Sequence, residues 1–194
     1  MRIALLAPLV TAIREPQAHG VAALLVDLAT GLQAAGHDVD LFAASGSLVP
    51  GVRVVDTGVR PEDLTESWFR PCEPRSPAGV AAAARAFDRA WDLIAGGNYD
   101  VVHGHAFDLP AIEGGRRVGC PVVHTLHVPY DPAVAACLRA AAGWKRPPLV
   151  VAISESQRAG WAEHVRVDAL GRGCPWSGSG GPRSMGGRCC SPAG

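Results

Sequence analysis

The sequence has no excess of charge of either sign and no long hydrophobic run. Its 194 residues include 18 basic and 18 acidic side chains, for a formal net charge of +0. This balance does not indicate a surface for nucleic acid or for an anionic membrane. No apolar run approaches the roughly 20 residues that span a bilayer. The run Ile3–Val10 is interrupted by Pro8 and has no signal-peptide cleavage site. We therefore expect a cytoplasmic protein without a transmembrane segment and without a nucleic-acid partner.

Paired cysteines and zinc-binding spacings are also missing. No CxxC pair occurs among the six cysteines, which are Cys72, Cys120, Cys137, Cys174, Cys189 and Cys190. Three of them are scattered singly and three fall in the last stretch of the chain. This distribution argues against a disulfide framework and against a zinc site. We predict reduced thiols and no bound metal ion.

What the chain does contain is a regular alternation of short apolar runs and amphipathic segments. Hydrophobic residues make up 48% of the chain, enough for the core of one domain. The apolar runs predict strands at 2–7, 39–42, 51–55, 99–105, 121–126 and 149–153. Helices are predicted at 20–36, 79–94, 106–118, 132–142 and after Ser154. Five or six strands alternating with helices predict an α/β fold, a doubly wound parallel sheet of the Rossmann-like kind.

Two segments depart from this alternation. Residues 57–77 are polar, contain four prolines and are predicted to form a long surface loop. After Asp168 the hydrophobic period disappears, and Gly, Pro, Ser and Cys dominate residues 169–194. A segment of that composition cannot bury enough surface to become ordered. We therefore predict a domain at 1–168 followed by a disordered tail at 169–194 that arises from a frameshift.

Histidines follow two neighbouring strands of the predicted sheet. His103 and His105 come at the end of one strand, and His127 follows the next. Because ligands of open α/β sheets bind beyond the carboxyl ends of the strands, we expect His105 and His127 to lie close together in a cleft. We predict a polar ligand, with a phosphate group, and a role for His127 as hydrogen-bond donor or proton carrier. The alternative for each histidine is a hydrogen-bonded core residue.

Two further positions are candidate ligand contacts. Gly20 opens a helix after the first strand, where free N–H groups and the helix dipole favour an anion; equally, it could simply begin the helix. No G-x-G-x-x-G pattern occurs between Pro8 and Gly20, which argues against a nicotinamide or flavin enzyme. Ser154 could contact a ligand, or it could cap a helix through a capping box with Gln157.

Six stretches follow the pattern of one protein family in the family's order. They are Met1–Pro8, His19–Gly20, Leu28–Val39, Asp100–His105, Pro121–His127 and Val151–Gln157. Together they resemble the amino-terminal lobe of GT-B glycosyltransferases of family 4. The resemblance covers residues 1–168, and within the family it is nearest to UDP-glucose-dependent pterin glucosyltransferases.

The resemblance implies a two-lobed retaining enzyme that needs no metal ion. It would transfer a hexose from a nucleotide diphosphate sugar, such as UDP-glucose, to a hydroxylated small-molecule acceptor, with no cofactor besides that donor. Donor phosphates would contact His19 and Gly20, where the family usually has two adjacent glycines. His127 matches the histidine at the reaction centre, and His105 matches a position on the cleft wall.

The resemblance stops at Asp168. The family's second lobe carries a Glu-x7-Glu element, and an Asn-Gly turn usually opens the linker to that lobe, but neither follows here. We therefore expect an amino-terminal lobe without its carboxy-terminal donor-binding lobe, and no transferase activity from this polypeptide alone. The alternatives are another GT-B sugar-nucleotide enzyme, such as a 2-epimerase, and a non-catalytic truncated product.

Overall fold

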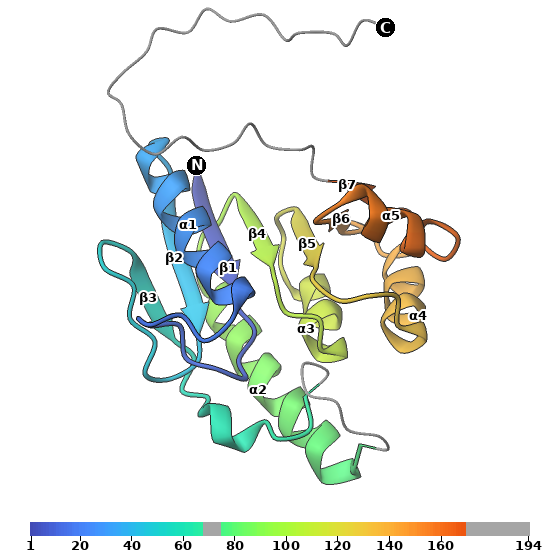
Figure 1. Cartoon of the computed structure of the whole chain (residues 1–194), viewed down its shortest axis with the longest axis horizontal. Helices are drawn as coiled ribbons and strands as arrows, with labels where there is room; N and C mark the ends of the chain where they lie inside the picture. The colour runs from blue at the N-terminus through green and yellow to red at the C-terminus, as the bar shows by residue number, and fades with distance from the viewer. Residues whose placement is uncertain (68–74, 170–194) are drawn as a thin grey trace, which may run out of the picture.

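The computed structural model describes residues 1–67 and 75–169, which form a layered α/β domain around one parallel sheet (Figure 1). The sheet has seven strands in these residues, in the order β3-β2-β1-β4-β5-β6-β7, and every neighbouring pair is parallel. The strands are β1 Arg2–Leu6, β2 Asp38–Ala43, β3 Arg53–Asp56, β4 Val101–Gly104, β5 Val122–Leu126, β6 Leu149–Ala152 and β7 Asp168–Ala169. This order confirms the predicted doubly wound, Rossmann-like sheet.

The helices begin where the sequence supplies capping side chains. They are α1 Gly20–Ala34, α2 Pro77–Ala95, α3 Leu109–Glu113, α4 Pro132–Ala141 and α5 Glu155–Ala162, with 3-10 turns η1 Pro61–Asp63 and η2 Gly114–Arg117. Side chains of the preceding residues accept hydrogen bonds from the first turns of α1, α2, α4 and α5. Gly36, just beyond α1, has a φ of +85°, a left-handed conformation that suits glycine at this position.

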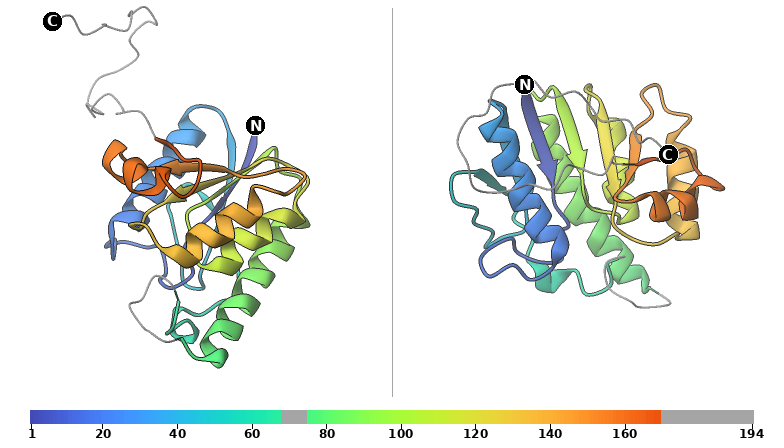
Figure 2. Two further views of the ribbon diagram at one scale, coloured as in Figure 1. Left: turned by 90° about the vertical axis from the view of Figure 1, so that its right-hand side faces the viewer. Right: turned by 45° about the horizontal axis from the view of Figure 1, so that its top comes forward.

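The helices cover both faces of the sheet (Figure 2). On one face, α1 packs on β1 and β2 through Leu5, Leu25 and Leu41, all fully buried. On the other face, α2 and α3 pack on β1, β2 and β4. This second core includes Leu6, Phe42, Phe87, Trp91 and Val102. A third core joins α4 and α5 to β5 and β6, and it includes Leu126, Leu138 and Trp161.

Two predicted elements need correction. The crossover at 106–118 holds the five-residue helix α3 and the turn η2 instead of one helix. Gly114, where α3 gives way to η2, lies against the indole of Trp91, and a side chain there would overlap the ring. Strand β7 was not predicted, because its two residues are too few to show a period. It pairs with β6 at the far edge of the sheet.

The predicted loop at 57–77 is more than a surface connection. It contains the turn η1, and Thr57, Leu64 and Ser67 within it are buried. The predicted tail lies outside the described residues except for Ala169, the second residue of β7. No described helix combines the length and the hydropathy needed to cross a membrane.

Candidate functional site

The carboxyl ends of β1, β4, β5 and β6 bring the predicted site residues to one edge of the sheet. His105 follows β4, His127 follows β5 and Ser154 comes two residues after β6. The backbone N–H of His105 donates to the Leu6 carbonyl at 2.9 Å, which joins the end of β4 to the end of β1. The parallel topology therefore places these side chains where ligands of such sheets bind.

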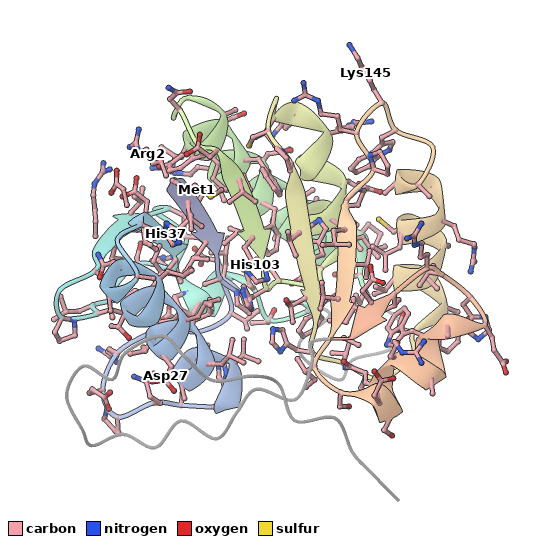
Figure 3. All side chains as sticks on the ribbon, turned by 90° about the horizontal axis from the view of Figure 1, so that it is seen from above. Met1, Arg2, Asp27, His37, His103 and Lys145 are labelled. Carbon is pink, nitrogen blue, oxygen red and sulfur yellow. The ribbon has the colours of Figure 1, made fainter. Side chains whose placement is uncertain are left out.

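The structure brings His105 and His127 into direct contact. Nδ1 of His105 lies 3.0 Å from Nε2 of His127, within hydrogen-bond distance, and the rings stack with an interplanar angle of 26°. His103 adds a third ring, with its centroid 4.1 Å from that of His105. Its Nε2 lies 2.7 Å from the hydroxyl oxygen of Thr125 on β5. Figure 3 labels His103, near the middle of the sheet. The expectation that His105 and His127 meet at this edge is confirmed.

His124 belongs to the opposite face of the sheet. It pairs in register with Gly104, and a side chain at Gly104 would approach Nδ1 of His124 to 2.7 Å. The His124 ring is 2% exposed, and neither ring nitrogen has a hydrogen-bond partner in the described residues. His124 is thus a packed core histidine behind the site.

Burial keeps these histidines neutral. It lowers the pKa of His103 and of His124 to about 4. Burial also lowers the pKa of His127 to about 4, with smaller contributions from His103 and His19. The pKa of His105 lies well below 6.5, chiefly because of burial and then because of the neighbouring histidines. A neutral imidazole offers one N–H donor and one acceptor nitrogen.

His19 and Gly20 begin helix α1. Nδ1 of His19 accepts a hydrogen bond from the Ala22 N–H at 3.3 Å, so His19 is the N-cap. Burial lowers the pKa of His19. No described residue accepts a hydrogen bond from the N–H groups of Gly20 and Val21, as expected for the first turn of a helix. A side chain at Gly20 would meet no atom within 4 Å, so packing does not require glycine there.

An open hollow of about 420 Å³ lies beside His127. We name it the His127 hollow, and it is lined by His127, Pro129, Tyr130, Ser154, Ser156, Gln157 and Gly160. Ser154 also caps α5, because its hydroxyl accepts from the Gln157 N–H at 3.1 Å. In a capping box the side chain of Gln157 would accept from the N–H of Ser154, but here it accepts from the N–H of Ile153, one residue earlier. A larger hollow of about 640 Å³ includes the start of β6, away from these histidines.

Helix α5 holds the loop that follows β5. The carbonyl of Val128 accepts two hydrogen bonds from α5, one from Nε2 of Gln157 at 2.9 Å and one from Nε1 of Trp161 at 3.2 Å. Tyr130 packs edge-on against Trp161 and stacks on His164 at a centroid distance of 3.9 Å. One wall of the His127 hollow is therefore held by both hydrogen bonds and ring contacts.

Sequence reasoning missed several of these residues. Tyr130 carries no motif, and only its place three residues after His127 could have indicated it. The capping-box motif gives Gln157 only a role at the start of the helix. Ser67 donates to both carboxylate oxygens of buried Asp108, at 2.7 and 2.9 Å, across 41 residues of sequence, which no local pattern reveals. Among residues 1–67 and 75–169, no group of three or more His, Cys, Asp or Glu side chains is arranged to hold a metal ion.

The sequence matches the profile of glycosyltransferase family 4 over residues 18–170. It is also 28% identical over 134 residues to the D-inositol 3-phosphate glycosyltransferase of Streptomyces griseus subsp. griseus. That alignment covers 65% of this chain and 28% of the Streptomyces protein, so the chain spans well under half of its relative.

A solved structure shows the same architecture. A sucrose-phosphate synthase structure from Thermosynechococcus elongatus superposes with a TM-score of 0.52 at 17% identity. The match covers 89% of this chain and 91% of that one, which supports the fold assignment. The glycosyltransferase SsfS6 of Streptomyces sp. SF2575, complexed with thymidine diphosphate, gives a TM-score of 0.49 at 22% identity over 82% of this chain and 51% of that one.

Proposed function

This chain belongs to glycosyltransferase family 4, and we propose that its described domain is the acceptor-side lobe of a two-lobed enzyme. The enzyme would transfer a hexose from a nucleotide diphosphate sugar to a hydroxylated acceptor. One observation carries the proposal: a neutral histidine pair and the His127 hollow lie together at the carboxyl edge of the sheet. The family resemblance adds retention of configuration and independence of metal ions.

The N-terminus of α1 is the proposed contact for the donor phosphates. The N–H groups of Gly20 and Val21, which donate to no described residue, lie at the positive end of the helix dipole. Gly20 has open space where a side chain would be, so an anion can approach the backbone closely. His19 supports this geometry by capping the helix. A positive helix end of this kind would stabilise the departing diphosphate.

The His127 hollow is the proposed acceptor site. Hydroxyl groups of Ser154 and Ser156 line it, together with the ring of Tyr130, which is 39% exposed. Such a lining suits a ligand that combines hydroxyl groups with a flat ring, because aromatic rings stack favourably. We accordingly propose UDP-glucose as donor and a pterin as acceptor, as the finer resemblance implies. The Streptomyces relative is a glycosyltransferase by name, which favours transfer over 2-epimerisation.

Titration of UDP-glucose into the ¹⁵N-labelled 194-residue chain tests the proposal. We expect amide shifts at Gly20 and Val21 and ring shifts at His127. The dissociation constant should be about 1 mM or weaker, near −4 kcal/mol, because one lobe makes only part of the contacts. The chain alone should show no turnover.

Two matched variants complete this experiment. Gly20→Ala should weaken binding, because the new methyl group lies where the phosphate would approach. Gly31→Ala lies in the same helix and also faces open space, so it should leave binding unchanged. Equal weakening by both variants, or saturable shifts confined to the larger hollow beside β6, would contradict the proposal.

A further inference from the structure

The contact between the two histidines determines which nitrogen of His127 is available to a ligand. Nε2 of His127 is engaged with Nδ1 of His105 at 3.0 Å. Nδ1 of His127 makes no hydrogen bond to any described residue, and His127 lines the hollow. A ligand in the His127 hollow can therefore form a hydrogen bond with this ring only through Nδ1.

The shared hydrogen can belong to either ring. If His105 donates from Nδ1, then His127 carries its own hydrogen on Nδ1. If His127 donates from Nε2, its Nδ1 is a bare acceptor, and His105 carries its hydrogen on Nε2. Nε2 of His105 is buried without a partner in the described residues, so either arrangement leaves one unbonded group there. Burial thus does not discriminate between them.

The intrinsic tautomer preference of the imidazole ring distinguishes the two arrangements. A neutral histidine side chain in water carries its hydrogen on Nε2 more often than on Nδ1. The second arrangement places both histidines in this preferred tautomer, whereas the first places both in the minor one. Donation from Nε2 of His127 to Nδ1 of His105 is therefore favoured.

We propose that His105 is a positioning residue that accepts a hydrogen bond from Nε2–H of His127 and so presents Nδ1 of His127 as an acceptor for a hydroxyl group of the acceptor substrate. The inference rests on the proposed function for the identity of the ligand, but not for the hydrogen bond itself. A phosphate diester or fully ionised phosphate has no hydrogen to donate to this nitrogen. His127 would thus recognise a hydroxyl group, while the donor phosphates would be bound at α1.

Nuclear magnetic resonance of the ¹⁵N-labelled 194-residue chain at neutral pH tests the hydrogen bond directly. The ¹⁵N shifts of His127 should show a protonated Nε2 and a bare Nδ1, and Nδ1 of His105 should also be bare. A scalar coupling across the hydrogen bond should join Nε2 of His127 to Nδ1 of His105. The Nε2–H signal of His127 should exchange slowly with water.

Variants of His105 and His103, both at the end of β4, distinguish a positioning role of His105 from simple packing. His105→Phe keeps a ring but removes the acceptor, so the slow exchange at His127 should be lost. His105→Asn places a carboxamide oxygen near the position of Nδ1 and should restore slow exchange. His103→Asn makes the same chemical change on a ring that bonds Thr125 instead, so the coupling between His105 and His127 should persist.

Opposite results would overturn the inference. A protonated Nδ1 on His105 would reverse the direction of the hydrogen bond. Averaged ring shifts in the parent chain would mean that no single tautomer is held. The parent spectrum decides even if His105→Phe does not fold. None of these measurements depends on transfer, so their failure is distinguishable from failure of UDP-glucose binding.

Discussion

Two buried polar clusters lie toward opposite ends of this sheet, and they are built on different principles. In the amino-terminal half of β2, the fully buried Asp40 accepts three hydrogen bonds on Oδ2. The donors are Arg53 at 2.8 Å, Arg2 at 3.2 Å and the Tyr99 hydroxyl at 2.6 Å. Burial raises the pKa of Tyr99, and the hydrogen bond to Asp40 raises it further. This cluster places opposite charges together.

At the carboxyl ends of the strands the polar groups are neutral. His103, His105 and His127 contact one another and Thr125, and no charged partner forms a hydrogen bond with any of the three rings in the described residues. Both clusters contain a buried atom without a partner in the described residues, Oδ1 of Asp40 and Nε2 of His105, so the difference between the clusters lies in their charge. The ion-paired Asp40 cluster joins β1, β2, β3 and the segment before β4, whereas the uncharged histidine cluster lies beside the His127 hollow.

Acidification should cause the largest loss of stability, because protonation would place positive charge on buried histidines that have no charged partner in the described residues. The folded-state pKa of His124 is about 4 against 6.5 in the unfolded chain, so the folded state binds fewer protons between these values. Stability contributed in this way is present above pH 6.5 and is lost as the pH falls toward 4. His124 alone should account for about 3 kcal/mol of the unfolding free energy.

Urea unfolding above pH 6.5 and near pH 4 measures this loss. His124→Leu should reduce the pH dependence by about the stated amount, because the other histidines keep their own contributions. The same pH dependence in the parent and in the variant would mean that His124 is accessible to protons in the folded chain.

Removal of the Asp40 charge should destabilise the fold without altering the site. Asp40→Asn takes the carboxylate from three donors and should cost about 2 kcal/mol. This is less than for a fully enclosed pair, because the Arg53 side chain is 65% exposed. Denaturant unfolding gives the magnitude, and an unchanged His127 ring spectrum shows that the two clusters are independent. Asp63→Asn, at the exposed pair with Arg60, is the matched control and should have no measurable effect.

Replacement of His127 should lower activity while leaving the fold intact. In a two-lobed transferase that carries this lobe, His127→Ala should lower kcat at least about tenfold, or about 1.4 kcal/mol of transition-state stabilisation. His37→Ala is the control, because His37 lies at the other end of the sheet, before β2 (Figure 3). A rate within about twofold of the parent would make His127 a packing residue.

Ser154 tests whether one residue can both stabilise the fold and bind the acceptor. Ser154→Ala removes the N-cap of α5 and should cost about 1 kcal/mol of stability. Ser154→Asp keeps a capping oxygen but adds charge to the His127 hollow. Thermal unfolding should distinguish these variants, while acceptor binding should weaken in both. Normal acceptor binding by Ser154→Ala would assign this residue to the helix cap alone.

Much of the fold could be predicted because local and global signals agree. The segment from Arg2 to Ala43 combines a short apolar run, an amphipathic helix that ends before Gly36 and a second apolar run. The meeting of His105 and His127 followed from topology alone, since parallel strands end at one edge. Each of these predictions needed only short-range patterns and one rule of strand order.

The remaining features depend on contacts between distant residues. Gly114, after α3, has no room for a side chain because Trp91 of another helix lies against it, and the buried Ser67 bonds an aspartate 41 residues away. The roles assigned to His19, Gly20, His105, His127 and Ser154 stay predictions. No sequence pattern indicated that His124 and His103 occupy opposite faces of the sheet with different surroundings.

The double hydrogen bond to the Val128 carbonyl has a mechanical consequence. Gln157 and Trp161 lie one turn apart on α5, so together they bind the loop after β5 to the side of this helix. The wall of the hollow and α5 must then move as one body. A ligand meets a surface that is already ordered, and its association therefore loses little conformational entropy there. Widening of the hollow at this wall would have to break these two hydrogen bonds or displace α5, whose Trp161 is buried in the third core.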